Sequence, residues 1–194
     1  AGAKQVKVHF SFGTMPYLVV AEAERASPPL LYIHGFTGMK ENWLPLMAAM
    51  GKSRRQYAPD LPGWGESDRC DALDYGYPEQ VERLAEFIDT VIGEPVDLVG
   101  HSMGGGISAL LAARHPEKVR RLVLVDAAGV RYEDNAFGQA VLDGEHPFAV
   151  SDIESLHRYL ALTFERPPYV PLLVARYLIA LRRAGHHFEM KVLQ

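Results

Sequence analysis

Short, continuous runs of apolar residues recur along this chain, and each stops at a glycine or an aspartate. The clearest are "PPLLYIHG" at 28–35, "VDLVG" at 96–100 and "RRLVLVD" at 120–126, with a weaker run inside 55–63. A run of this length without polar alternation is typical of a strand buried on both faces. The chain therefore predicts a mainly parallel sheet whose strands are joined by crossover segments.

The segments between these runs have the periodicity of helices. Apolar residues recur every three or four positions over 41–50 and 78–92, and the second of these begins with Pro78 and stops at Gly93. A third helix is expected over 102–115. Alternating strands and helices predict an α/β fold with helices on both faces of the sheet, and such sheets bind ligands beyond the carboxyl ends of their strands.

The start of the chain follows a different pattern. Residues 5–12 alternate between polar and apolar side chains and lead through a Gly-Thr turn into a second apolar segment at 16–23. Two such segments joined by a short turn predict an antiparallel pair of strands.

Beyond the last apolar run, no further strand is visible. The next helix opens with Ser151 and Glu154, which have the spacing of a capping box, and the helix after it is expected to end at Gly185, before a third one begins. We therefore expect residues 1–130 to form the α/β core. Residues 131–194 are expected to form a helical lid over the strand ends.

The stretch Gly100-His101-Ser102-Met103-Gly104 lies between a predicted strand and a predicted helix. In that context the G-x-S-x-G pattern predicts a nucleophile elbow. Such a sharp turn leaves no room for flanking side chains, which explains the two glycines. The N–H of Met103 would face a developing oxyanion at the start of the helix. We interpret Ser102 as the nucleophile; the alternative is a glycine-rich turn with a polar cap.

The loop "HGFTG" at 34–38 follows the first buried strand, so it lies at the same end of a parallel sheet as the elbow. The N–H of Phe36 is the candidate second oxyanion donor. Gly35 and His34 are assigned a supporting role in this loop. The turn-rich stretch "DLPGWGESD" at 60–68 is given a structural role, with Trp64 as a candidate for lining the pocket.

Together, "HGFTG", "DLPGWGES", "GHSMGG" and "RRLVLVDAAG" resemble the α/β-hydrolase fold family, in the family's order. The resemblance spans most of residues 5–130. The segment from Phe164 onward looks like the helical cap of lid-bearing, monoacylglycerol-lipase-like esterases. The serine distinguishes the chain from epoxide hydrolases and haloalkane dehalogenases, whose elbow carries aspartate.

The resemblance also implies a catalytic acid after a seventh strand and a catalytic histidine after an eighth. Only six strands are visible, so we expect the last two strands to be missing and both residues to lie beyond residue 194. Asp126, at the end of the sixth strand, is interpreted as a turn residue. None of the eight histidines present is expected to act as the base.

The resemblance implies a serine hydrolase of carboxylic esters, similar to esterases and lipases, that works through an acyl-enzyme on Ser102. The apolar lid predicts a small-molecule ester substrate with an apolar group. One alternative is a catalytically inert fragment or a ligand-binding protein of the same fold. Another is a hydrolase of carbon–carbon bonds or a thioesterase.

Composition narrows the range of partners. The net charge is −4 and the basic residues are scattered, which argues against nucleic acid. The single cysteine forms no intramolecular disulfide, and no metal-ligand spacing is visible, so we expect neither a metal nor a cofactor. No apolar run is long enough to span a bilayer, and the start lacks a signal-peptide pattern. The compartment stays open, with the cytoplasm favoured over secretion. The sixth strand would present an exposed sheet edge for self-association.

Overall fold

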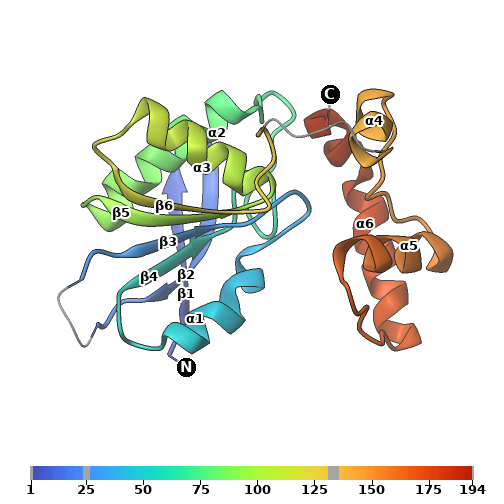
Figure 1. Ribbon diagram of the computed structural model, residues 1–194, viewed down its shortest axis with the longest axis horizontal. Helices are drawn as coiled ribbons and strands as arrows, with labels where there is room; N and C mark the ends of the chain where they lie inside the picture. The colour runs from blue at the N-terminus through green and yellow to red at the C-terminus, as the bar shows by residue number, and fades with distance from the viewer. Residues whose placement is uncertain (1, 24–26, 131–135, 194) are drawn as a thin grey trace. The chain divides into compact units, whose positions relative to one another are not determined.

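A six-stranded sheet forms the centre of the first part of the chain (Figure 1). The computed structural model describes residues 2–23, 27–130 and 136–193. The chain divides into two compact units, residues 1–131 and residues 132–194. The strands of the first unit are β1 (Lys4–Phe10), β2 (Gly13–Val20), β3 (Leu30–Ile33), β4 (Gln56–Pro59), β5 (Val96–His101) and β6 (Val119–Val125).

The spatial order of the strands is β1-β2-β4-β3-β5-β6. β1 pairs with β2 and β2 with β4 in antiparallel fashion, while β4, β3, β5 and β6 are parallel. The predicted hairpin and the mainly parallel sheet are both confirmed. From β3 the chain adds β4 on one side and β5 on the other. This order makes the carboxyl ends of β3 and β5 the topological switch point, where open α/β sheets bind ligands.

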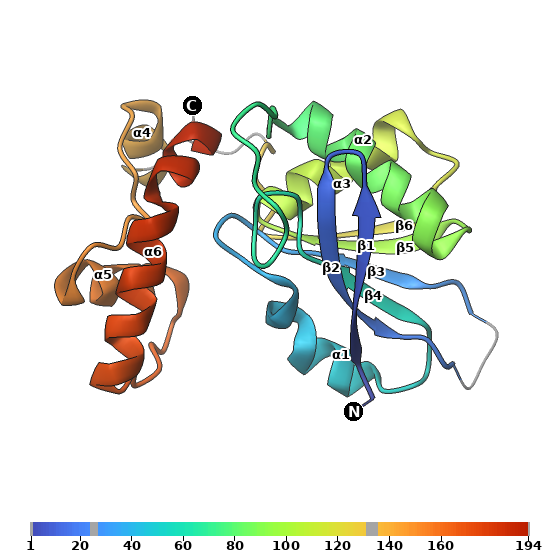
Figure 2. The ribbon, with the colours of Figure 1, turned by 180° about the vertical axis from the view of Figure 1, so that it is seen from behind.

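Helices cover both faces of this sheet, as predicted (Figures 1 and 2). One face carries a 3₁₀ turn, η1 (Lys40–Trp43), and α1 (Leu44–Met50); the other carries α2 (Tyr77–Phe87) and α3 (Met103–Arg114). On the α1 face, the rings of Trp43 and Tyr32 stack with centroids 5.2 Å apart. The apolar side chains buried together on that face are Leu18, Val20, Leu30, Tyr32, Trp43, Met47, Ala58 and Val99.

The helix expected over 78–92 is α2 followed by a π-helical turn, η2 (Ile88–Ile92). Gly93 ends it in the left-handed conformation, with φ +75° and its N–H donating to the carbonyl of Ile88 at 2.8 Å. A residue with a side chain is disfavoured there, so glycine is the usual stop. The predicted stop at Gly93 is confirmed.

β6 lies at one edge of the sheet, where it pairs with β5 alone among the described strands. Val123, Leu124 and Val125 at its end are all exposed. An unpaired strand edge with apolar side chains favours pairing with another chain. Self-association through this edge stays a prediction.

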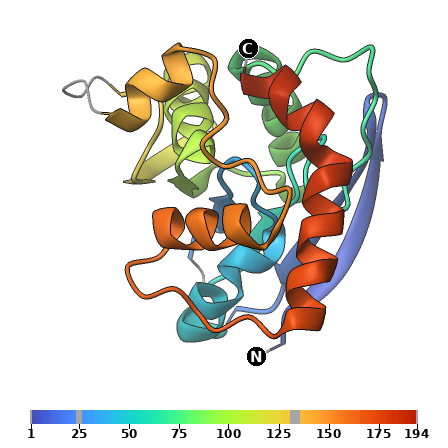
Figure 3. The ribbon, with the colours of Figure 1, turned by 90° about the vertical axis from the view of Figure 1, so that its right-hand side faces the viewer.

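The second unit is helical throughout its described elements, which are α4 (Ala136–Leu142), α5 (Ile153–Thr163) and α6 (Leu172–Leu193). α5 lies beside the long α6 (Figure 3). The buried side chains that join them are Val150, Leu156, Leu160, Ala175 and Ile179. The role of this unit as a lid stays a prediction. No helix in the described ranges has the length and apolarity needed to cross a bilayer.

The capping box predicted at Ser151 and Glu154 is wrong by one residue. Asp152 is the N-cap of α5: its side chain accepts from the N–H of Ser155 at 2.7 Å, and the Ser155 hydroxyl accepts from the N–H of Asp152 at 2.9 Å. Aspartate caps a helix as well as serine does. The two overlapping patterns could not be separated from sequence alone.

The predicted helix end at Gly185 is also wrong, because α6 continues through it as a single helix. Glycine inside a helix costs only about 1 kcal/mol relative to alanine. Contacts on either side offset that cost. Arg182 and Glu189, two turns apart, form an ion pair at 3.1 Å, and the Glu189 carboxylate also lies 2.9 Å from the Nε2 of His146.

Candidate active site

Ser102 occupies a sharp turn between β5 and α3, with φ +52° and ψ −122°. A residue with a side chain rarely adopts a positive φ, and such strain persists only where surrounding contacts fix the backbone. Here the Ser102 N–H donates to the Val125 carbonyl at 3.0 Å. The Ser102 carbonyl accepts from the N–H groups of Gly105, Gly106 and Ala128 at 2.8, 3.2 and 2.9 Å. The turn is therefore tied to both α3 and the loop after β6.

The side chain of Ser102 is half-buried and makes no capping hydrogen bond to α3. The alternative interpretation as a polar cap therefore has no contact to support it. Met103 is the first residue of α3, so its N–H has no carbonyl partner within the helix. A helix N-terminus with such a donor stabilises negative charge nearby.

The glycines around the serine leave no space for side chains. A Cβ on Gly100 would lie 2.5 Å from the carbonyl oxygen of Gly104 and 2.8 Å from the Cα of Gly105. A Cβ on Gly104 would lie 2.5 Å from the carbonyl oxygen of Ile33 and closer still to that of His34. The start of α3 can therefore lie this close to β3 only because residue 104 is glycine, and this close to the end of β5 only because residue 100 is glycine.

The loop after β3 reaches the elbow through Gly35. A Cβ there would lie 2.9 Å from the Cβ of Ser102 and 3.1 Å from the Nδ1 of His101. The structure thus brings the two predicted motifs into direct contact. Phe36 is the residue that follows this contact, and His101 is exposed beside it.

His34 is buried, and backbone groups engage both of its ring nitrogens. Nε2 accepts from the N–H of Leu61 at 3.0 Å, so Nδ1 carries the proton and donates to the carbonyl of Gly35 at 2.8 Å. Burial lowers the pKa of His34. The hydrogen bond to the Gly35 carbonyl and the nearby charge of Asp60 offset only part of that effect. A neutral imidazole with both nitrogens committed suits a positioning role, not that of a base for Ser102.

This arrangement predicts a pH dependence of stability. The pKa of His34 is lowered in the folded protein, whereas an unfolded histidine titrates near pKa 6.5. Below about pH 6.5 the unfolded chain takes up a proton that the folded chain does not. The free energy of unfolding should therefore fall on acidification, by up to about 1.4 kcal/mol per pH unit. Urea unfolding between pH 5 and 8 measures it.

The control for this prediction is the His34→Asn variant. Its stability should change less steeply with pH than that of the wild type. Burial also lowers the pKa of His146, but that residue is present in both proteins and its contribution cancels. Parallel curves for the two proteins would contradict the assignment.

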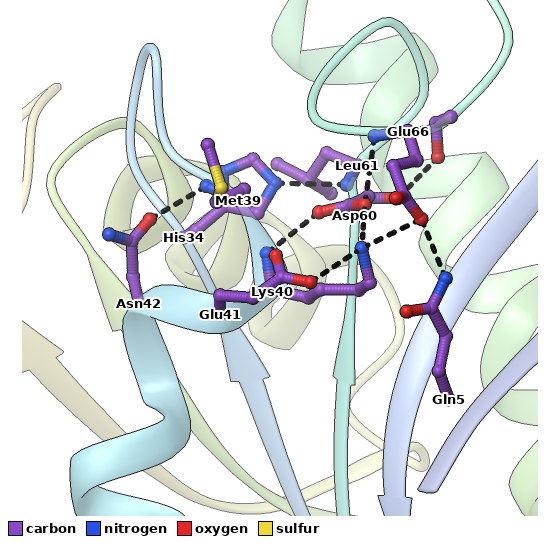
Figure 4. Close-up of polar contacts among 10 residues, drawn as sticks. Gln5, His34, Met39, Lys40, Glu41, Asn42, Asp60, Leu61 and Glu66 are labelled. Carbon is purple, nitrogen blue, oxygen red and sulfur yellow. Dashed lines mark hydrogen bonds and ion pairs between the residues drawn. The ribbon is translucent and has the colours of Figure 1, made fainter. Parts of the chain in front are cut away.

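An ionic cluster around a buried lysine, beside His34, was not predicted from the sequence (Figure 4). The ammonium of Lys40 lies 2.8 Å from Asp60, 2.9 Å from Glu41 and 3.2 Å from Glu66. Lys40 and Asp60 are 1% and 0% exposed. Burial works against the charge of Lys40, but hydrogen bonds to Asp60 and Glu41 outweigh it and raise the pKa of the lysine. Lysine is seldom buried, so its position in the sequence gave no signal.

Trp64 packs edge-on against Phe36, with ring centroids 4.9 Å apart. Its side chain is buried. The sequence suggested that Trp64 lines a pocket. This role stays a prediction, and the ring contact places Trp64 against the residue predicted to bear an oxyanion donor.

No described hydrogen bond joins a histidine to the hydroxyl of Ser102. In the first unit, His9 lies beside the Thr14 hydroxyl, His115 lies 3.2 Å from Glu82, and His34 is committed to backbone groups. In the second unit, His146 is paired with Glu189. Among the residues that the structure describes, no group of three or more histidine, cysteine or acidic side chains is placed to hold a metal ion.

Comparison with known proteins places these features in context. A family model described as alpha/beta hydrolase fold matches residues 28–146. The 2-hydroxymuconate semialdehyde hydrolase of Pseudomonas sp. (strain CF600) is 45% identical over 107 residues, which cover 54% of this chain and 38% of that protein. Lipase 1 of Psychrobacter immobilis is 31% identical over 172 residues, which cover 87% of this chain and 54% of that protein.

Among solved structures, a membrane phospholipase A described as a novel bacterial virulence factor is similar to this chain with a TM-score of 0.90. The two are 33% identical, and the match covers 98% of this chain and 61% of that one. The part of the chain that matches thus spans between 38% and 61% of the length of each of these three proteins.

Proposed function

The chain belongs to the α/β-hydrolase family, and from this premise we propose that it carries the nucleophile and oxyanion hole of a serine hydrolase of carboxylic esters. The observation that carries the proposal is the turn at Ser102, strained and half-buried, with Gly35 of the neighbouring loop packed against it. A hydroxyl at a strand-to-helix turn, flanked by backbone N–H groups, suits attack on a carbonyl carbon.

In the proposed mechanism a histidine removes the proton from Ser102 as its oxygen attacks the ester carbonyl. The N–H groups of Phe36 and Met103 hold the oxyanion. The alcohol leaves, and water then releases the acid from the acyl-enzyme on Ser102. We propose that the histidine and its acid partner lie outside the 194 residues. No described contact joins a histidine to the hydroxyl of Ser102, and His9, His34 and His115 have other partners. Gly100, Gly104, His34, Gly35 and His101 support the geometry.

We further propose that residues 131–194 act as a lid and that the substrate carries an apolar group. The second unit exposes several large apolar side chains, including Leu173 and Tyr177 of α6. Apolar side chains of this kind favour contact with an acyl chain or a similar group.

The names of the relatives point to two types of reaction, and a panel of substrates can distinguish between them. One is named as a lipase and another as a semialdehyde hydrolase. We expect the complete natural polypeptide to hydrolyse p-nitrophenyl esters faster than a matched thioester or a 1,3-diketone. Initial rates with each substrate at equal concentration measure this. Faster cleavage of the diketone would favour a carbon–carbon bond hydrolase. No cleavage of any substrate, with saturable ligand binding, would favour a binding protein of the same fold.

A further inference from the structure

Two loops meet beside the elbow, and three separate contacts join them. The first loop, residues 34–40, follows β3 and carries Phe36; the second, residues 60–66, follows β4. His34 accepts from the N–H of Leu61 at 3.0 Å, the rings of Phe36 and Trp64 touch, and Lys40 binds Asp60. The first loop is therefore held at both of its ends and at its middle.

Two hydrogen bonds join Lys40 to Asp60, one from the backbone of Lys40 and one from its side chain. The backbone N–H of Lys40 donates to Oδ1 of Asp60 at 2.7 Å, and its ammonium donates to Oδ2 at 2.8 Å. Oδ2 also accepts from the N–H of Glu66 at 2.9 Å. One carboxylate thus fixes the end of the first loop and the fold of the second (Figure 4).

The second loop is shaped to close over this carboxylate. Gly65 has φ +57°, and a Cβ there would overlap the carboxylate of Asp60. A buried ion pair adds little stability compared with a well-packed apolar pair, but it does fix the direction in which its groups lie. The cluster is thus better suited to orienting the loops than to stabilising the core.

We propose that Lys40 and Asp60 are positioning residues that hold the N–H of Phe36 where it binds the oxyanion. The inference rests on the proposed function, because it assigns these residues to the same reaction. Neither side chain touches the substrate; both act through the loop that bears Phe36. Displacing a donor of this kind by about 1 Å costs up to about 100-fold in rate.

The test compares Lys40→Met with a matched control in the complete natural polypeptide. The control is Arg54→Met, which breaks another largely buried ion pair, Arg54–Asp97 at 2.6 Å. Asp97 lies near the start of β5, whereas Ser102 follows the end of that strand. The measurements are kcat and KM for a p-nitrophenyl ester, the affinity for a trifluoromethyl ketone that mimics the tetrahedral intermediate, and the melting temperature.

For Lys40→Met we expect kcat to fall about 10- to 100-fold, in step with the affinity for the ketone, while KM changes less than twofold. Arg54→Met should lower the melting temperature and leave kcat within twofold of the wild type. Should Lys40→Met fail to fold, Asp60→Asn replaces it, because Lys40 keeps the carboxylates of Glu41 and Glu66. That variant should show the same split with about a 10-fold loss of kcat.

The outcomes separate the two proposals. An active wild type whose kcat is unchanged in Lys40→Met or Asp60→Asn overturns the positioning role alone. An equal loss of kcat in Arg54→Met does the same, because the effect would then follow stability. A wild type that neither hydrolyses esters nor reacts at Ser102 overturns the proposed function and, with it, this inference.

Discussion

A Ser102→Ala variant of the complete natural polypeptide is expected to lose ester hydrolysis by a factor on the order of 10⁶ in kcat, as the loss of a serine nucleophile does in a well-studied protease. The Ser102 side chain makes no capping hydrogen bond, so its removal should leave the fold intact. The loss would therefore reflect chemistry and not stability. Steady-state kinetics measure the rate, and circular dichroism with thermal melting checks the fold.

Covalent labelling gives the same prediction a second readout. A fluorophosphonate probe should add one label to the wild type, seen by intact mass, and none to Ser102→Ala. Ser108→Ala is the matched control, because Ser108 is a buried serine of α3 on the helix that starts at the elbow. That variant should keep its label. A label that persists in Ser102→Ala would show that another residue is the nucleophile.

The second large effect is expected for Gly104→Ala, which should lower the stability of the fold. A methyl group in Gly104→Ala would lie 2.5 Å from the carbonyl oxygen of Ile33, and both groups belong to rigid elements. Overpacking against backbone cannot be relieved by a rotamer change, so we expect a loss of about 3 kcal/mol or more in the free energy of unfolding. Urea unfolding of the variant and the wild type measures the difference.

Gly93→Ala is the control for this prediction. Gly93 has a left-handed φ of +75°, but a Cβ there meets nothing within 4 Å. Only the backbone preference is lost, which costs about 1–2 kcal/mol. A loss at Gly104 no larger than that at Gly93 would mean that α3 shifts away from β3 and that the close approach is not rigid.

Most of the scaffold could be predicted because its signals are local. The apolar runs of β3, β5 and β6 and the glycine stop at Gly93 each follow from a few neighbouring residues. The predictions at Ser151 and Gly185 failed for two different reasons. Two capping patterns overlapped at the first, and distant contacts outweighed the small cost of glycine at the second.

The candidate site could be predicted only as far as its motifs extend. The elbow and the loop at 34–38 are contiguous stretches, and the parallel sheet places them at one end. The ion pair between Lys40 and Asp60 joins residues that lie 20 positions apart in the sequence. Lysine and aspartate are usually exposed, so their residue types do not predict that they are buried. The hydrogen bond from the Ala128 N–H to the Ser102 carbonyl could not be predicted from the sequence either, because it involves only backbone groups.

The hydrogen bond from Ala128 is one of four that fix the backbone of Ser102. All four hydrogen bonds that hold the turn at residue 102 are made by its own N–H and carbonyl, and none by its hydroxyl. These hydrogen bonds therefore do not depend on the hydroxyl group of Ser102. A substitution that exchanges the reactive group keeps the atoms that make all four bonds, so the chemistry of such a turn can change while the fold around it is kept.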